Sequence, residues 1–177
     1  MEKYLCFDIG YVKPGIVLII KDLTDNTLNI EVFENIKFTS NLDSISILEY
    51  FFSQKINYVI LEQQLTNKNI SLMQFIHGYS IAKGIKVIIK RPFSCLREKD
   101  EKKTTRSLKK NFSIDYLNSV LLDNNLNKKY IAKDSDICDA INLGLLQIYS
   151  INKKNINTLD IKIKKITHLR FALVTQN

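Results

Sequence analysis

The order of the apolar runs most limits what this chain can fold into. Three short runs rich in β-branched residues come first, at residues 4–9, 15–20 and 28–33. Turn-forming residues separate them, with Pro14 before the second run and Asp25 before the third. Short strands joined by tight turns predict an antiparallel meander at the start of the chain.

The chain then changes to an alternation of helical and strand-like patterns. This alternating pattern predicts helices at 41–54, 69–83, 112–122 and 134–151, with strands at 57–61 and 86–89. Gly84 is suited to end the second helix, and Pro92 to stop the last strand. A meander that leads into helix–strand units predicts an α/β fold, with a mixed five-stranded sheet flanked by helices.

Two segments fit this pattern less well. Residues 94–111 are polar, charged and weakly periodic, and we interpret them as a mobile basic loop. Ile161, Ile163 and Ile166 alternate within the basic tail, which is compatible with a strand, a helix or an ordered arm. We expect one domain at 1–153, with 154–177 as a basic C-terminal extension of that domain.

Charge and cysteine usage narrow the class of protein. The 26 lysines and arginines exceed the 18 acids and give a net charge of +8, which favours a polyanionic partner, although simple solubility is the alternative. The three cysteines are far apart and form no zinc motif, which fits a reducing compartment. We see neither a signal peptide nor an apolar run of the roughly 20 residues that a membrane helix needs, and expect a soluble intracellular protein.

The positive charge is concentrated in the middle of the chain. Only Glu98, Asp100 and Glu101 oppose it there. The strip consists of Lys83, Lys86, Lys90, Arg91, Arg97, Lys99, Lys102, Lys103, Arg106, Lys109 and Lys110. Such a strip is suited to phosphate contacts that position DNA without reading its sequence, and the alternative is a solvated loop.

Four carboxylates stand out by position. Asp8 ends the first predicted strand and Glu62 follows the fourth, while Asp136 and Asp139 lie three residues apart in the last helix. Spacing i,i+3 places two acids on one helical face, where they repel each other unless a cation relieves them. Four carboxylates at one point would suit Mg²⁺ or Mn²⁺, and two ions about 4 Å apart can catalyse phosphodiester hydrolysis.

Each acid has an ordinary explanation as well. Asp8 could be a turn or cap residue, and Glu62 a simple strand-end acid. Asp134 and Asp136 are both suited to cap the last helix or to complement its dipole. Asp139 lies deeper in that helix and fits such a role less well. The case for a metal site therefore rests on the set.

The set resembles the RuvC-like junction resolvases of the ribonuclease H superfamily, and most closely the poxvirus resolvases. The resemblance is carried by residues 7–10 with Gly15, by 61–64, and by 136–140. Residues 75–79 and the pair Lys109-Lys110 also fit the poxvirus pattern. Together these motifs cover roughly residues 4–150, whereas the tail after 153 matches no pattern of the family.

The resemblance implies a ribonuclease H-like fold, a homodimer paired through the helix at 69–83, and Mg²⁺-dependent cutting of four-way (Holliday) junctions. It implies that Mn²⁺ substitutes, that each site holds two ions, and that the enzyme acts on viral replication intermediates in the host-cell cytoplasm. Asp8, Glu62, Asp136 and Asp139 would hold the metal. Lys110 or Lys109 would act near the scissile phosphate, with Lys102 and Lys103 as rivals. The expected DNA-contacting residues are Lys102, Lys103, Arg106, Lys109, Lys110, Arg91 and Gln63.

Three alternatives stay open at this stage. Asp8, Gly10 and Gly15 also resemble the phosphate loop of actin-like kinases, but 177 residues leave no space for the second domain those enzymes need. A nuclease of the same fold that acts on RNA or an RNA–DNA hybrid would carry the same acids. A nucleic-acid-binding module without catalysis is the third, and the presence of all four acids argues against it.

Overall fold

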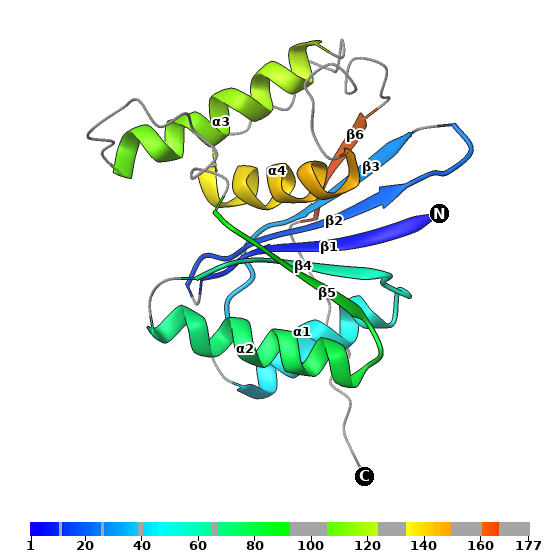
Figure 1. The fold of residues 1–177 in the computed structure, drawn as a ribbon, viewed down its shortest axis with the longest axis vertical. Coiled ribbons are helices and arrows are strands. Elements are labelled where there is room, and N and C mark those ends of the chain that lie inside the picture. The colour runs from blue at the N-terminus through cyan, green and yellow to red at the C-terminus, as the bar shows by residue number, and fades with distance from the viewer. Residues whose placement is uncertain are drawn as a thin grey trace.

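The computed structural model describes residues 1–10, 12–25, 27–38, 41–64, 67–92, 106–123, 134–149 and 161–166. These residues form one mixed sheet with helices on both faces (Figure 1). The sheet consists of β1 (Glu2–Asp8), β2 (Gly15–Lys21), β3 (Leu28–Phe33), β4 (Tyr58–Glu62), β5 (Lys86–Lys90) and β6 (Ile161–Ile166). The predicted α/β class is therefore confirmed.

The strands are ordered β5-β4-β1-β2-β3-β6 across the sheet. Only β2 runs against its neighbours, and the pairs β1–β4, β4–β5 and β3–β6 are parallel. The carboxyl ends of the other five strands therefore meet at one edge of the sheet. We call this edge the catalytic edge, because the candidate acids lie along it.

The helices cover the two faces in pairs. Helices α1 (Asn41–Phe52) and α2 (Asn67–Ala82) lie on one face. Helix α4 (Ser135–Tyr149) lies on the other face, and α3 (Arg106–Asp123) packs on its outer side (Figure 1). Successive side chains of a strand point to opposite faces. In β1, Leu5 and Phe7 are accordingly buried towards α1 and α2, while Cys6 is buried towards α4.

The described residues form six strands where the sequence predicts five. The alternating isoleucines of the tail form β6, which pairs in parallel with β3 from Ile161 opposite Leu28 to Ile166 opposite Phe33. This strand depends on a partner more than a hundred residues earlier in the chain, so local periodicity could not decide between a strand and a helix. Lysines on this edge strand discourage pairing with a further chain.

The prediction that residues 94–111 form a loop is wrong for its last part. Helix α3 begins at Arg106 rather than at Phe112. The segment from 106 to 111 contains good helix formers, arginine, leucine and lysine, but lacks an apolar stripe. Helix propensity without amphipathic spacing explains why the periodicity missed this turn and a half.

Among the described residues, no helix is both long and apolar enough for a membrane span.

Candidate active site

Asp8 and Glu62 meet at the catalytic edge because their strands are neighbours. Strands β1 and β4 are parallel, and Phe7 pairs with Leu61. The next residue of each strand is an acid, so Asp8 and Glu62 stand side by side where the strands end. Their carboxyl groups share a hydrogen bond. The sequence prediction that these two acids are brought together is consistent with this register.

Gly15 brings the start of α4 to the same place. Gly15 is the β2 partner of Asp8. A Cβ added to Gly15 would lie 2.0 Å from the backbone oxygen of Asp136, closer than any side chain tolerates. The missing side chain therefore lets the first turn of α4 rest on the first residue of β2. This contact fixes the position of the Asp136 backbone, and Asp139 lies one turn further along the helix.

The beginning of α4 is fixed by a cap and an ion pair. Oδ1 of Asp134 accepts a hydrogen bond from the Asp136 amide at 3.0 Å, which is the geometry of an N-cap. Oδ2 of the same carboxylate lies 2.8 Å from Nζ of Lys13. Burial alone would raise the pKa of Asp134, but the bonds from Lys13 and the Asp136 amide lower it below its usual range. The capping role considered for Asp134 is confirmed.

Glu62 experiences the charges of the other acids. Burial raises the pKa of Glu62 above its usual range, and the negative charges of Asp139 and Asp136 raise it further. Hydrogen bonds with Asp8 and Gln64 offset only part of this rise. The Cys138 thiol lies beside the same acids: burial first, and then the charges of Asp139, Asp134 and Asp136, raise its pKa to about 12. All four candidate acids therefore act on one small region.

A neutral residue at position 62 should stabilise the protein in the absence of metal. The folded-state pKa of Glu62 is raised, so the folded state loses stability relative to the unfolded state as pH rises from about 4.3 through the folded pKa. We expect Glu62→Gln to raise the free energy of unfolding in EDTA by about 1 kcal/mol at pH 8 and by less at pH 4. Urea unfolding of both proteins at the two pH values checks this, and an equal effect at both would contradict it.

Two polar residues at this site were not among the predicted site residues. Nε2 of Gln64 donates to Oε2 of Glu62 at 2.9 Å. Nδ2 of Asn69, from the first turns of α2, donates to Oε1 of Gln64 at 3.2 Å and to the backbone oxygen of Ile9 at 3.1 Å. Asn69 thereby orients Gln64, and Gln64 orients Glu62. Gln64 stands in the motif at 61–64, but Asn69 has no local signal in the sequence.

The predicted DNA-contacting residues lie in three parts of the chain. Gln63 and Arg91 are exposed and directly follow β4 and β5 at the catalytic edge. Arg106, Lys109 and Lys110 belong to the first turns of α3, and the structure describes only their backbone. Lys102 and Lys103 lie outside the described residues.

A buried amide links α3 to α4. Nδ2 of Asn142 donates to the backbone oxygen of Ser113 at 3.0 Å and to its Oγ at 2.8 Å. Both residues are fully buried. Ser113 is one helical turn after Lys109 and Lys110, so this link sets the position of the predicted lysines relative to the α4 acids.

Asn142→Ala should therefore destabilise the protein measurably. The change removes both bonds and leaves the buried Ser113 oxygens without this donor, which costs about 1–3 kcal/mol. Ser113→Ala retains the bond to the backbone oxygen and should cost less. Thermal unfolding of the two variants checks the order, and equal or reversed losses would speak against the link.

The chemistry of the acid set fits a hard cation. Asp8, Glu62, Asp136 and Asp139 offer only carboxylate oxygens, which suit Mg²⁺ or Mn²⁺ better than softer metals. Within the described part of the chain, no three acidic, histidine or cysteine side chains are already arranged as a complete metal site. The set has the donor atoms and the sign of charge that such a cation needs.

Several cysteine and aromatic residues have structural roles. Cys6 and Cys138 are buried free thiols. Phe112 packs at an angle to Tyr116, with ring centroids 6.4 Å apart. On α2, Ile76 is core, whereas Phe75 and Tyr79 are only partly buried and stack on each other.

The chain is similar in sequence and in fold to viral proteins. The model of the family described as Poxvirus A22 protein matches residues 4–153. The crystal structure of the fowlpox virus Holliday junction resolvase is 26% identical, with a TM-score of 0.57, covering 84% of this chain and 98% of that one. The complex of the fowlpox virus resolvase with substrate Holliday junction DNA is also 26% identical, with a TM-score of 0.60, covering 84% and 97%.

A bacterial structure shares the fold. Thermus thermophilus RuvC is 14% identical, with a TM-score of 0.55, and the match covers 88% of this chain and 97% of that one. The search of curated proteins finds no match. These likenesses confirm the ribonuclease H-like fold that the resemblance implied.

Proposed function

Because the chain belongs to the family of poxvirus A22 proteins, we propose that it is a structure-selective DNA endonuclease that resolves four-way (Holliday) junctions. The observation that carries this proposal is the gathering of four acids at one sheet edge, in a fold shared with the fowlpox virus Holliday junction resolvase. The fowlpox resolvase is also known in complex with junction DNA. The proposed setting is the resolution of branched viral replication intermediates in the cytoplasm of the infected cell.

The proposed cofactor is Mg²⁺, with Mn²⁺ as a substitute and two ions per site. Asp8, Glu62, Asp136 and Asp139 would hold it. When bound, the metal lowers the pKa of a water molecule and neutralises charge on the leaving oxygen of a phosphodiester. Burial, and then the charges of Asp139 and Asp136, raise the pKa of Glu62, and this supports the assignment because a bound cation would compensate these negative charges.

The chain's own residues hold this site in shape. Asp8 is central, since it lies beside Glu62 and opposite Gly15, on which α4 rests. Gln64 directs the Glu62 carboxylate by a hydrogen bond, and Ser135 donates to Oδ1 of Asp136 at 3.0 Å. Lys110 or Lys109, from α3, is proposed to stabilise negative charge that develops on the scissile phosphate.

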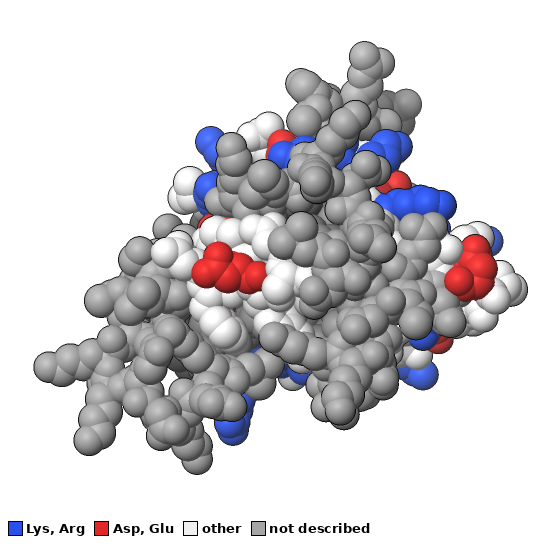
Figure 2. All heavy atoms as spheres, turned by 90° about the horizontal axis from the view of Figure 1, so that it is seen from above, with Lys and Arg blue, Asp and Glu red and all other residues white. Residues whose placement is uncertain are grey.

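DNA binding is proposed to use basic residues that follow the strands at this edge or lie on α3. Arg91 and Gln63 follow strands that end at this edge, and Arg106, Lys109 and Lys110 lie on α3, which the Asn142–Ser113 link joins to α4. On the face seen in Figure 2, lysines and arginines lie in several groups, most of them towards the upper margin and others along the lower side, and acids form small separate groups. Contacts with phosphates would recognise the shape of a branch rather than its sequence.

A homodimer is proposed as the active form. The row of stacked rings formed by Phe52, Tyr79 and Phe75, with Ile81 56% exposed nearby on α2, supports a pairing face there. A two-fold dimer would place two sites on strands related by symmetry. Such an arrangement accounts for paired nicks in opposite strands of a junction.

A substrate panel tests the proposal against its rivals. The protein is incubated with equal amounts of labelled four-way junction, linear duplex and RNA–DNA hybrid, and cleavage rates are compared. We expect the junction to be cut at least about a hundredfold faster than the others, because only the branch fits the shape-reading surface. Preferred cleavage of the hybrid would establish the RNA-directed alternative. Junction binding without any cleavage would indicate a binding module.

A further inference from the structure

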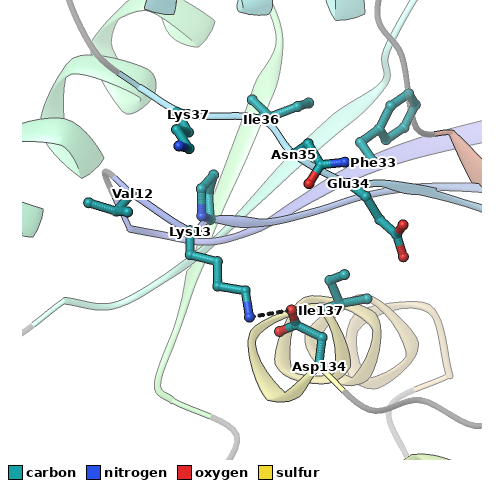
Figure 3. Close-up of a pocket in the computed structure, with 10 residues that line it drawn as sticks. Val12, Lys13, Phe33, Glu34, Asn35, Ile36, Lys37, Asp134 and Ile137 are labelled. Atoms are coloured by element: carbon teal, nitrogen blue, oxygen red, sulfur yellow. Dashed lines mark ion pairs between the residues drawn. The ribbon is translucent and has the colours of Figure 1, made fainter.

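A second feature lies on the catalytic edge beside the acids. It is a cavity of about 350 Å³ between the β1–β2 turn, the segment that follows β3, and the first turn of α4. Figure 3 shows these three segments facing one another. We call it the β3 groove. It is lined by Val12, Lys13, Pro14, Phe33, Glu34, Asn35, Ile36, Lys37, Asp134 and Ile137.

The groove adjoins the part of the chain that carries the acids. Asp134 and Ile137 line it, and Asp136 stands between them at the start of α4. Pro14 lines it too, and the next residue is Gly15, on which the Asp136 backbone rests. The hydrogen bond with Asp134 raises the pKa of Lys13, and the charge of Asp136 adds to this rise. A ligand in the groove would therefore lie beside the turn of α4 that carries Asp136.

The groove balances its two acids with lysines and carries one lysine more on its rim. Its two acids already have lysine partners, since Asp134 pairs with Lys13 at 2.8 Å and Glu34 pairs with Lys165 at 2.7 Å. Lys37 is exposed and adds a further positive charge to the rim. The Lys13 side chain is 71% exposed, so it can turn from Asp134 towards an anion at little cost.

The walls favour a ligand that is not a bare phosphate. Phe33, Ile36 and Ile137 are buried residues whose surfaces close the inner side, and Val12 is exposed at the mouth. An apolar wall with lysines at its rim matches a nucleotide, whose sugar packs on the wall while its phosphate faces the ammonium groups. A cavity of this volume holds a small molecule or one nucleotide.

We propose that the β3 groove binds the nucleotide of the cleaved DNA strand that flanks the scissile phosphate, and that Lys13 and Lys37 contact its phosphate. The inference deepens the proposed function and rests on it. Lys13 exchanges its bond with Asp134 for one with the DNA phosphate. Both lysines are thus substrate-positioning residues that set where the strand lies relative to the acids.

Junction binding tests this without relying on cleavage. Lys13→Gln, Lys37→Gln and the double variant are made in an Asp8→Asn background, so that the DNA stays intact. Each single change should weaken binding about three- to tenfold and lower the slope of log affinity against log salt by about 0.7–0.9. Lys55→Gln is the matched control, because Lys55 is exposed before β4, at the opposite edge of the sheet. It should leave both quantities nearly unchanged.

Neutral phosphates identify the contact. Cleavage by the wild-type protein first locates the cut. A set of junctions is then made, each with one neutral methylphosphonate at a different position beside the cut. At the contacted phosphate, the neutral group should weaken binding of the Asp8→Asn protein as much as Lys13→Gln does, with no further loss when both changes are combined. Additive losses at every position would overturn the proposal.

The other outcomes separate the two claims. If wild-type protein cuts junctions while the lysine variants bind with unchanged affinity and salt slope, the groove assignment is wrong and the proposed function stands. If the protein neither binds nor cuts junctions, both fall together. Asp134→Asn gives an independent check. Asparagine retains the helix cap but releases Lys13, so binding should tighten, and the gain should vanish in combination with Lys13→Gln.

Discussion

Asp8→Asn is expected to lower the rate of junction cleavage by about 10³-fold or more, while junction binding is retained. Asp8 occupies the centre of the acid set: it shares a hydrogen bond with Glu62 and stands opposite Gly15, against which α4 packs. Asparagine retains the shape of the side chain but removes one negative charge, so metal binding suffers more than folding. Single-turnover cleavage and gel-shift binding, measured on the same preparations, check both halves.

The matched control for this change is Asp25→Asn. Asp25 is exposed in the β2–β3 turn at the opposite edge of the sheet, and it accepts a bond from the Thr27 amide that asparagine can also accept. Its activity should equal that of the wild type. If Asp8→Asn retained a tenth or more of the cleavage rate, Asp8 would not be the central metal ligand. If it lost binding as well, its role would be structural.

Gly15→Ala is expected to be the most damaging single-methyl change in the chain. The added Cβ would meet the backbone oxygen of Asp136 at 2.0 Å and its carbonyl carbon at 2.4 Å. No rotamer change relieves a clash with backbone, so α4 must move away from β2. We expect a loss of about 3 kcal/mol or more in the free energy of unfolding, together with loss of cleavage because Asp136 and Asp139 move with the helix.

Gly144→Ala provides the comparison. Gly144 belongs to α4 itself and faces the sheet, and its added Cβ would meet the ends of two side chains, Cδ1 of Ile19 at 2.4 Å and Sγ of Cys6 at 2.7 Å. Side-chain ends can shift, so we expect a smaller loss of about 1–2 kcal/mol and partial retention of activity. Urea unfolding and cleavage rates rank the two variants. A stable, active Gly15→Ala protein would show that this contact does not position the acids.

Much of the architecture could be predicted because it is encoded locally. The meander and the β–α alternation follow from short runs with clear periodicity, and they led to the class of fold and to the neighbouring positions of Asp8 and Glu62. The convergence of Asp136 and Asp139 on these acids required one further step, since nothing near them in the chain shows that α4 crosses this edge. The motif that contains Gly15 led to this prediction through its resemblance to the resolvase family. The close contact between Gly15 and the Asp136 backbone gives the physical reason.

The features that could not be predicted depend on contacts between distant segments. Strand β6 is stabilised by β3, and a strand-like alternation alone does not name its partner. Asn69 reaches Gln64 only because the β4–α2 connection folds back on the strand end. The β3 groove is formed by three segments separated by about twenty and a hundred residues, and its Lys13–Asp134 ion pair has no sequence signature. Residues of ordinary appearance acquire their roles through such contacts.

The most direct test of the central claim is to map the cuts in an immobile four-way junction labelled on each strand in turn. The reaction is run with Mg²⁺ and with EDTA, beside a linear duplex of the same sequence. We predict paired nicks at symmetric positions in two opposite strands of the junction. The linear duplex should stay uncut, and the junction should be cut only when the metal is present. Equal cutting of the duplex, unpaired nicks, or cleavage that persists in EDTA would contradict it.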